Sequence, residues 1–169
     1  MHMRFATSLD LALLTYWDQQ PHVVAARGDD GPFEWETELP RTPDWRELLI
    51  AESDGRPIGF IQIIDPAREE TRSWGDVEPD LRAIDIWIGE AADLGRGYGS
   101  ELMRHALERC FADPAVKAVL IDPLASNTRA RRFYERLGFR CIERRTFGDD
   151  DCFVLRIERR DWEAANGLG

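Results

Sequence analysis

Residues 83–111 read AIDIWIGEAADLGRGYGSELMRHALERCF, and three elements follow one another within this segment. Residues 83–89 (AIDIWIG) are apolar and rich in β-branched side chains, which predicts an interior strand. Residues 94–100 (LGRGYGS) are typical of a glycine-rich turn. Residues 101–111 (ELMRHALERCF) repeat apolar side chains at helical spacing. We therefore expect a strand, a tight turn and a helix in direct succession.

The chain before this segment predicts a helix, a loop and a hairpin. Residues 8–17 (SLDLALLTYW) have the pattern of an amphipathic helix. Residues 25–43 carry glycine, proline and acids without a period, which indicates a surface loop with room for a short helix. Residues 44–50 are a further candidate helix. Residues 48–64 contain two extended segments around the turn Ser53-Asp54-Gly55-Arg56, which predicts a β-hairpin.

The chain after residue 111 predicts strand, helix and strand. Asp113-Pro114 ends the central helix, and residues 116–121 (VKAVLI) predict a strand. Ser126 or Asn127 can cap a helix that runs through Arg136 and ends at Gly138. Residues 152–158 (CFVLRIE) predict the last strand. The order of elements predicts an α/β or α+β fold on a mixed, mostly antiparallel sheet flanked by helices.

Composition limits the classes of function. A chain of 169 residues fits one domain, and a hydrophobic content of 43% supports one core. A formal charge of −10 disfavours binding to nucleic acid or anionic lipid and favours a cationic partner. Because we find neither a membrane-spanning run nor a leader, we expect a cytoplasmic protein. The three cysteines and three histidines are scattered, so we expect no metal site.

The glycine turn is a candidate anion site. Glycines at alternate positions (Gly95, Gly97 and Gly99) let the backbone bend tightly and point its amides outward at the start of a helix. Those amides and the positive end of the helix dipole suit a phosphate. The spacing matches neither the dinucleotide-binding fingerprint nor the P-loop. The alternative is a flexible helix start without a ligand.

A second motif, NTRARRFYERLGF, occupies residues 127–139. Positions seven apart return to nearly the same side of a helix, so Asn127 and Tyr134 share a face and can line one groove. Alternatively, Tyr134 is a half-buried core aromatic and the arginines are a solvated face.

With these two motifs in order, the chain resembles the GCN5-related N-acetyltransferases, which transfer acetyl from acetyl-CoA to an amine. The resemblance covers residues 58–139, which we take as the CoA-binding core. The aminoglycoside 6'-N-acetyltransferases are the members that the chain resembles most, in the run from Trp74 through Arg82-Ala83-Ile84-Asp85, in LGRGYG at residues 94–99, in Asp113-Pro114 and in Asp122-Pro123-x-x-Ser126-Asn127. The segment His22-Val23-Val24 adds to this likeness.

The resemblance implies a set of contacts with acetyl-CoA. The amides of the turn would hold the diphosphate, the strand Asp85 to Gly89 would pair with the pantetheine arm, and Asn127 would hold the arm from the other side. Leu94 stands where the family usually has Gln or Arg, so one side-chain contact is missing. The expected cofactor-binding residues are Trp87, Ile88, Leu94, Gly95, Arg96, Gly97, Tyr98, Gly99, Ser100 and Asn127.

Asp85 is the candidate base. An alkylamine attacks a thioester only when neutral, although its pKa is near 10, so a group must remove its proton. A carboxylate inside an apolar strand is costly unless it faces a wet cleft. The alternatives are a structural ion pair with Arg82, or a carboxylate that only orients the ammonium. A backbone amide near Trp87 or Ile88 would stabilise the oxyanion, and Tyr134 would protonate the leaving thiolate.

Charge also guides the choice of acceptor. Residues 65–85 hold seven acids and three bases, which favours a cationic substrate such as a polyamine or an aminosugar. We expect Asp122 to contact it, whereas the triplet at 149–151 either joins it or solubilises a turn. Trp74 either stacks on a sugar ring or fills the core. Ala26-Arg27 replaces a tryptophan pair of the aminoglycoside enzymes, and an arginine there would repel a polycation.

Several assignments therefore remain open at the level of sequence. The first is an acetyl-CoA-dependent N-acetyltransferase that works by direct transfer in a ternary complex, with an aminoglycoside as one candidate acceptor. Other acceptors are another small amine, a polyamine, a siderophore precursor or a protein amine. The alternative class is a non-catalytic CoA-binding module. The family allows both monomers and homodimers.

Overall fold

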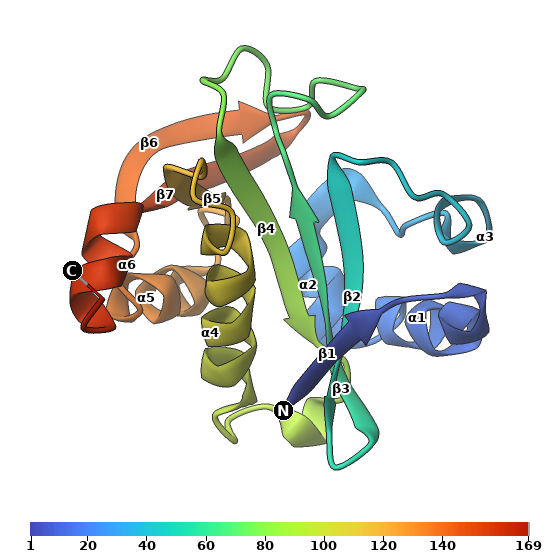
Figure 1. Ribbon diagram of the computed structural model, residues 1–169. Coiled ribbons are helices and arrows are strands. Elements are labelled where there is room, and N and C mark those ends of the chain that lie inside the picture. The colour runs from blue at the N-terminus through green and yellow to red at the C-terminus, as the bar shows by residue number, and fades with distance from the viewer. Residues whose placement is uncertain (169) are drawn as a thin grey trace.

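The computed structural model describes residues 1–168, which contain a seven-stranded sheet in the order β1-β2-β3-β4-β5-β7-β6 (Figure 1). Within this part of the chain, β4 and β5 pair in parallel and the other neighbours pair antiparallel. The predicted mixed, mostly antiparallel sheet is therefore confirmed. The strands are β1 (His2–Phe5), β2 (Arg46–Ser53), β3 (Arg56–Ile64), β4 (Leu81–Ile88), β5 (Ala118–Ile121), β6 (Arg140–Phe147) and β7 (Asp150–Glu158).

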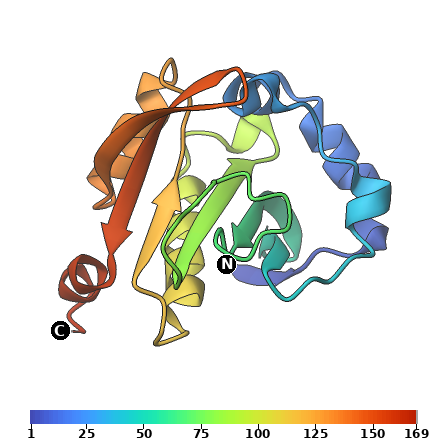
Figure 2. The ribbon, with the colours of Figure 1, turned by 90° about the horizontal axis from the view of Figure 1, so that it is seen from above.

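Helices cover both faces of the sheet. α4 packs against β3 and β4, with α5 and α6 beside the C-terminal strands, whereas the N-terminal helices lie on the other side (Figures 1 and 2). No helix in residues 1–168 is long and apolar enough to cross a membrane. The α-helices are α1 (Leu11–Asp18), α2 (Pro21–Arg27), α3 (Trp35–Glu38), α4 (Tyr98–Phe111), α5 (Thr128–Arg136) and α6 (Arg159–Ala165). The 3-10 helices are η1 (Ser8–Asp10), η2 (Gly28–Asp30) and η3 (Ala91–Asp93).

The predicted hairpin is present as β2 and β3. Its two turn residues, Asp54 and Gly55, have φ values of 51° and 76°, the left-handed conformation of a type I′ turn. The candidate helix over residues 44–50 is wrong, because β2 occupies Arg46–Ser53. Residues 48–51 are buried on β2 between β1 and β3, so their continuous apolar run packs on both faces of the sheet.

One face of the sheet is interrupted by polar side chains. Side chains alternate between the two faces of a strand, so Trp87, Asp85 and Ala83 of β4 share a face. Trp87 packs on the apolar cluster under α1 and α3, and Ala83 belongs to a second cluster around Trp74. Asp85 and its register partner Gln62 lie between these two clusters. The apolar face therefore has a polar gap at its centre.

Candidate active site

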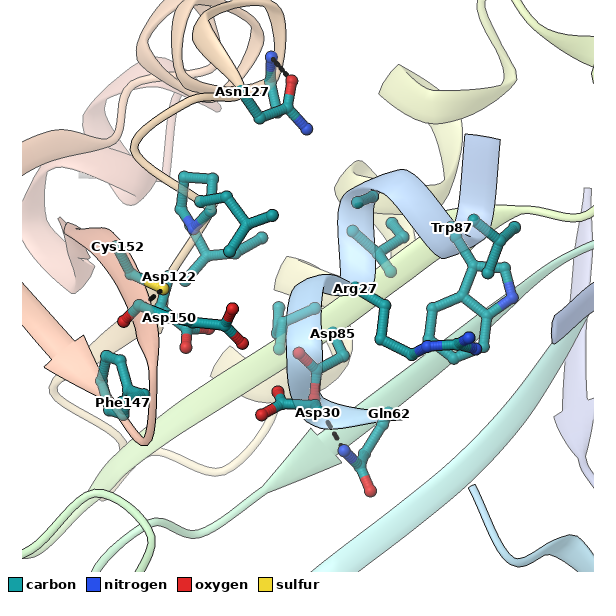
Figure 3. A pocket seen from close by; sticks show the side chains of 18 of the residues that line it. Arg27, Asp30, Gln62, Asp85, Trp87, Asp122, Asn127, Phe147, Asp150 and Cys152 are labelled. Carbon is teal, nitrogen blue, oxygen red and sulfur yellow. Dashed lines mark hydrogen bonds between the residues drawn. The ribbon is translucent and has the colours of Figure 1, made fainter. Parts of the chain in front are cut away.

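The parallel pair β4 and β5 separates after three residue pairs, Leu81–Ala83 with Ala118–Leu120. A cavity of about 390 Å³ lies at this opening. Its walls come from α2 and the loop behind it, from β3 and β4, from the chain after β5, from α5 and from the β6–β7 hairpin (Figure 3). The polar gap in the sheet, at Asp85 and Gln62, forms part of this wall.

The exposed backbone of β4 belongs to alternate residues. The amide of Gly89 donates to the carbonyl of Ile58 on β3 at 2.9 Å. Because backbone groups along an antiparallel strand alternate in direction, Trp87 also faces β3, whereas Ile86 and Ile88 face away from it. The carbonyl of Ile88 accordingly accepts a hydrogen bond from Nε2 of His22 at 2.8 Å. Of the two expected amide donors, Ile88 faces the opening and Trp87 does not.

Asp85 is held by Gln62 and not by Arg82. Nε2 of Gln62 donates to Oδ2 of Asp85 at 2.7 Å. Arg82 pairs with Asp65 and Asp113, so the expected alternative of an Arg82–Asp85 ion pair is wrong. Asp85 is exposed to the space of the cavity that it lines. Desolvation raises the pKa of Asp85, the hydrogen bond from Gln62 lowers it, and Asp30 raises it.

Three further carboxylates share the cavity with Asp85: Asp30, Asp122 and Asp150 (Figure 3). Desolvation raises the pKa of Asp30, and the charges of Asp150 and Asp29 add to this shift. The pKa of Asp122 is raised well above its usual value by desolvation and then by Asp85 and Asp30. The carboxylates therefore repel one another in a partly desolvated space, which favours a bound cation.

Arg27 is the basic side chain in this cavity wall. Its Nη1 donates to the carbonyl of Asp18 at 3.1 Å and lies 3.9 Å from the Asp18 carboxylate. Its Nε is buried and has no hydrogen-bond acceptor among residues 1–168. Asp18 therefore offsets part of the charge of Arg27, and the cavity remains negative overall.

Asn127 and Tyr134 both line the cavity, as their spacing predicts. Oδ1 of Asn127 accepts from the amide of Ala130 at 3.1 Å and caps α5. The pKa of Tyr134 is raised by desolvation, and the charges of Asp85 and Asp122 raise it further. The phenol therefore stays protonated at neutral pH and can donate a proton or hydrogen bond.

The glycine turn has the open backbone that an anion needs. Gly95 and Gly97 have φ values of 72° and 84°, and a Cβ built on either would meet nothing within 4 Å. Gly97 is the N-cap of α4 and provides no side-chain cap. Among residues 1–168, no backbone carbonyl accepts a hydrogen bond from the amides of residues 95–100. Gly99 instead serves packing, because its Cβ would lie 3.3 Å from Phe133.

Trp74 fills the core, which was one of its two expected roles. Its side chain is 6% exposed, and its ring lies 4.9 Å from that of Phe147 in an edge-to-face arrangement. The cavity-lining residues include Phe147 and not Trp74. Asp122, the other residue expected to contact the acceptor, does line the cavity.

Asp150 and Asp151 of the acidic triplet at 149–151 have different surroundings. Asp150 is 8% exposed and lines the cavity, whereas Asp151 is exposed and pairs with Arg144. Asp30, Gln62 and His22 belong to the site although no motif singled out their roles. Their positions depend on how distant segments meet. The local signals are a polar residue inside an apolar strand at Gln62 and the segment His22-Val23-Val24, which gave no role to His22.

Comparison with known proteins agrees with this architecture. The family model described as an acetyltransferase (GNAT) domain matches residues 6–147. The aminoglycoside N(6')-acetyltransferase type 1 of Klebsiella pneumoniae is 33% identical over 151 residues, which cover 81% of this chain and 72% of that protein. The chain belongs to the GNAT acetyltransferase family, and the expected resemblance is confirmed.

Solved structures show the same fold. A structure of the aminoglycoside acetyltransferase AAC(6')-Ib with coenzyme A and kanamycin has a TM-score of 0.85 and 30% identity, covering 97% of this chain and 98% of that chain.

A more distant relative by sequence is the lysine N-acyltransferase MbtK of Mycolicibacterium paratuberculosis. It is 27% identical over 83% of this chain and 65% of that protein.

Proposed function

We propose that this chain, acting as one domain with its cofactor-binding core at residues 58–139, moves acetyl from acetyl-CoA to a primary amine of a small cationic molecule. The observation that carries the proposal is the position of four carboxylates in the cavity where β4 and β5 separate. An open, amide-rich turn lies at the start of the adjacent helix α4. The molecule therefore has carboxylates that can attract a cationic acceptor, and free amides that can bind the acetyl donor.

The glycine turn fits the diphosphate of acetyl-CoA. Both glycines with left-handed backbone face open space, and the amides of the turn are available to anionic oxygens. The outward backbone of Ile86 suits an amide group of the pantetheine arm, whereas the carbonyl of Ile88 is already bonded to His22. Asn127 lines the opposite wall. Acetyl-CoA supplies an activated acetyl group as a thioester.

Asp85 and Tyr134 supply the proton transfers. Asp85 takes a proton from the ammonium, so that the amine lone pair can attack the carbonyl carbon. The outward amide of Ile88 stabilises the oxygen that gains charge. As the carbon–sulfur bond breaks, Tyr134 donates its proton to the thiolate. The nitrogen then gives up its surplus proton, which restores the phenol of Tyr134, and Asp85 releases the proton it took to solvent. The products are an amide and a free thiol, formed by direct transfer in a ternary complex.

Asp122 and the neighbouring carboxylates select the acceptor. An aminoglycoside is one candidate, because the chain is similar to aminoglycoside 6'-N-acetyltransferases over most of its length. Arg27 introduces a positive charge into the cavity wall and opposes a highly charged acceptor. A lysine-type amine is a second candidate, since the chain also resembles lysine N-acyltransferases.

Free-thiol release from acetyl-CoA with a panel of amines tests the proposal. The panel contains kanamycin, spermidine, free lysine and a lysine-containing peptide, and calorimetry measures CoA binding separately. We expect CoA binding and thiol release with at least one small amine, and a large loss of turnover in Asp85→Asn. CoA binding without release favours a non-catalytic module, and activity confined to peptides favours a protein acetyltransferase.

A further inference from the structure

Arg56 contacts the residue that precedes the glycine turn. It begins β3, directly after the hairpin turn, and reaches Asp93 at the end of η3. Nη1 of Arg56 donates to Oδ2 of Asp93 at 2.7 Å, and Nη2 donates to Oδ1 at 2.9 Å. This two-bond arrangement fixes the orientation of both groups.

The two partners differ in burial. The side chain of Asp93 is 4% exposed, whereas that of Arg56 is 51% exposed. A buried carboxylate is costly without a charged partner, so Asp93 depends on Arg56. The Arg56 hydrogen bond lowers the pKa of Asp93, which keeps this carboxylate ionised at neutral pH. The positive charge of Arg96, in the glycine turn, lowers the pKa of Asp93 further.

We propose that Arg56 is a positioning residue for cofactor binding, which cancels the charge of Asp93 beside the diphosphate-binding turn. This inference rests on the proposed binding of acetyl-CoA by residues 95–100. A diphosphate brings further negative charge to the turn. Without Arg56, the Asp93 carboxylate repels that charge.

A double-mutant cycle tests this role. The variants are Arg56→Gln, Asp93→Asn and the double substitution, and calorimetry measures the Kd for CoA. We expect Arg56→Gln to weaken CoA binding about tenfold, a moderate effect because Arg56 is half-exposed. The double variant should recover to within about twofold of the original protein, since the uncompensated charge is gone. Asp93→Asn alone should bind CoA at least as tightly as the original protein.

A substrate without the diphosphate distinguishes a specific effect on diphosphate binding from a general loss of activity. S-acetylpantetheine should react with the same kcat/KM in Arg56→Gln as in the original protein. Arg68→Gln is the matched control, because Arg68 is 55% exposed and pairs with Asp44 instead of a residue next to the turn. This control removes the same charge and should leave the Kd for CoA unchanged.

Three outcomes overturn the role of Arg56: an unchanged Kd in Arg56→Gln, an equal loss with S-acetylpantetheine, or no recovery in the double variant. Asp93→Asn serves the same purpose if Arg56→Gln fails to fold, because weaker CoA binding in that variant also overturns it. An original protein that binds no CoA overturns both this inference and the proposed function, whereas the other outcomes leave the proposed function intact.

Discussion

The carboxylate of Asp150 accepts hydrogen bonds from the backbone amide of Asp29 at 3.1 and 3.2 Å. These residues lie 121 positions apart in the chain, and their contact joins η2 to β7 beside the cavity. A Cβ at Gly28 would lie 2.6 Å from Oδ1 of Asp150, so this approach requires glycine. The contact thereby sets the distance between the N-terminal loop and the C-terminal hairpin.

Gly28→Ala should open this side of the cavity. The added methyl group displaces Asp150, and the φ value of 71° at Gly28 adds strain, so we expect a loss of stability of about 1–2 kcal/mol. KM for the amine should rise, while the Kd for CoA should stay constant. Gly31→Ala is the matched control, because Gly31 has a φ value of 74° and no neighbour within 4 Å of its Cβ. An equal rise in KM in both variants would contradict the role of the Asp150 contact.

Gln62→Met should change the pH dependence of the reaction. The hydrogen bond from Gln62 favours the charged form of Asp85 and lowers its pKa. Removing this bond raises the pKa of Asp85. Because the base must be ionised to accept a proton, the acidic limb of the kcat/KM profile should move to higher pH. An unmoved limb in a correctly folded variant would show that Asp85 is not the titrating base.

Asp122→Asn should increase stability and weaken binding of the amine. The pKa of Asp122 is raised in the folded protein, so its favourable contribution is complete below the unfolded pKa and is lost as pH rises through the folded value. The variant should therefore melt about 2–4 °C higher near pH 8, which corresponds to about 1 kcal/mol, and the difference should vanish near pH 4. Thermal melts across this range measure it, and a difference independent of pH would refute the electrostatic cause.

Tyr134→Phe should slow turnover without weakening amine binding. Burial and the nearby carboxylates raise the pKa of Tyr134, so the phenol keeps its proton for the leaving thiolate. Loss of a general acid typically reduces the rate by about 100-fold or more. Steady-state kinetics with acetyl-CoA should show a lower kcat and a nearly constant KM for the amine. Unchanged turnover would remove Tyr134 from the mechanism.

Elements with a strong local pattern could be predicted from the sequence. The strand at 83–89, the glycine turn and the helix after it correspond to β4, the turn and α4, because each combines a clear periodicity with clear end signals. The helix 127–136 matches α5 with Asn127 as its N-cap. The hairpin was marked by an Asp-Gly turn, whose φ values require such residues.

Other elements have no such pattern. β6 (RCIERRTF) is an edge strand whose side chains are mostly exposed, so it needs no alternation of apolar residues. β1 has four residues, and α2 and α6 have seven each, which is too short for a decisive period. Residues 44–50 imitate a helix because apolar side chains at 45, 48 and 49 also fit a 3.6-residue repeat.

The candidate site was only partly predictable for a topological reason. Asp85, Asn127 and Tyr134 stand in recognisable motifs and all line the cavity. Asp30 and Asp150 join them only because η2 meets β7, a contact between distant parts of the chain. A local sequence pattern does not show which distant segments come into contact. The number of carboxylates that line the cavity could therefore be learned only from the structure.

The cavity where β4 and β5 separate is lined by segments that lie far apart in the sequence. The glycine turn and α4, where we propose that the diphosphate binds, come from the middle of the sequence, whereas the loop at residues 26–33, which lines the proposed acceptor cavity, comes from near the beginning. If these sites are as proposed, substitutions in that early loop change which amine is accepted and leave the donor-binding residues intact.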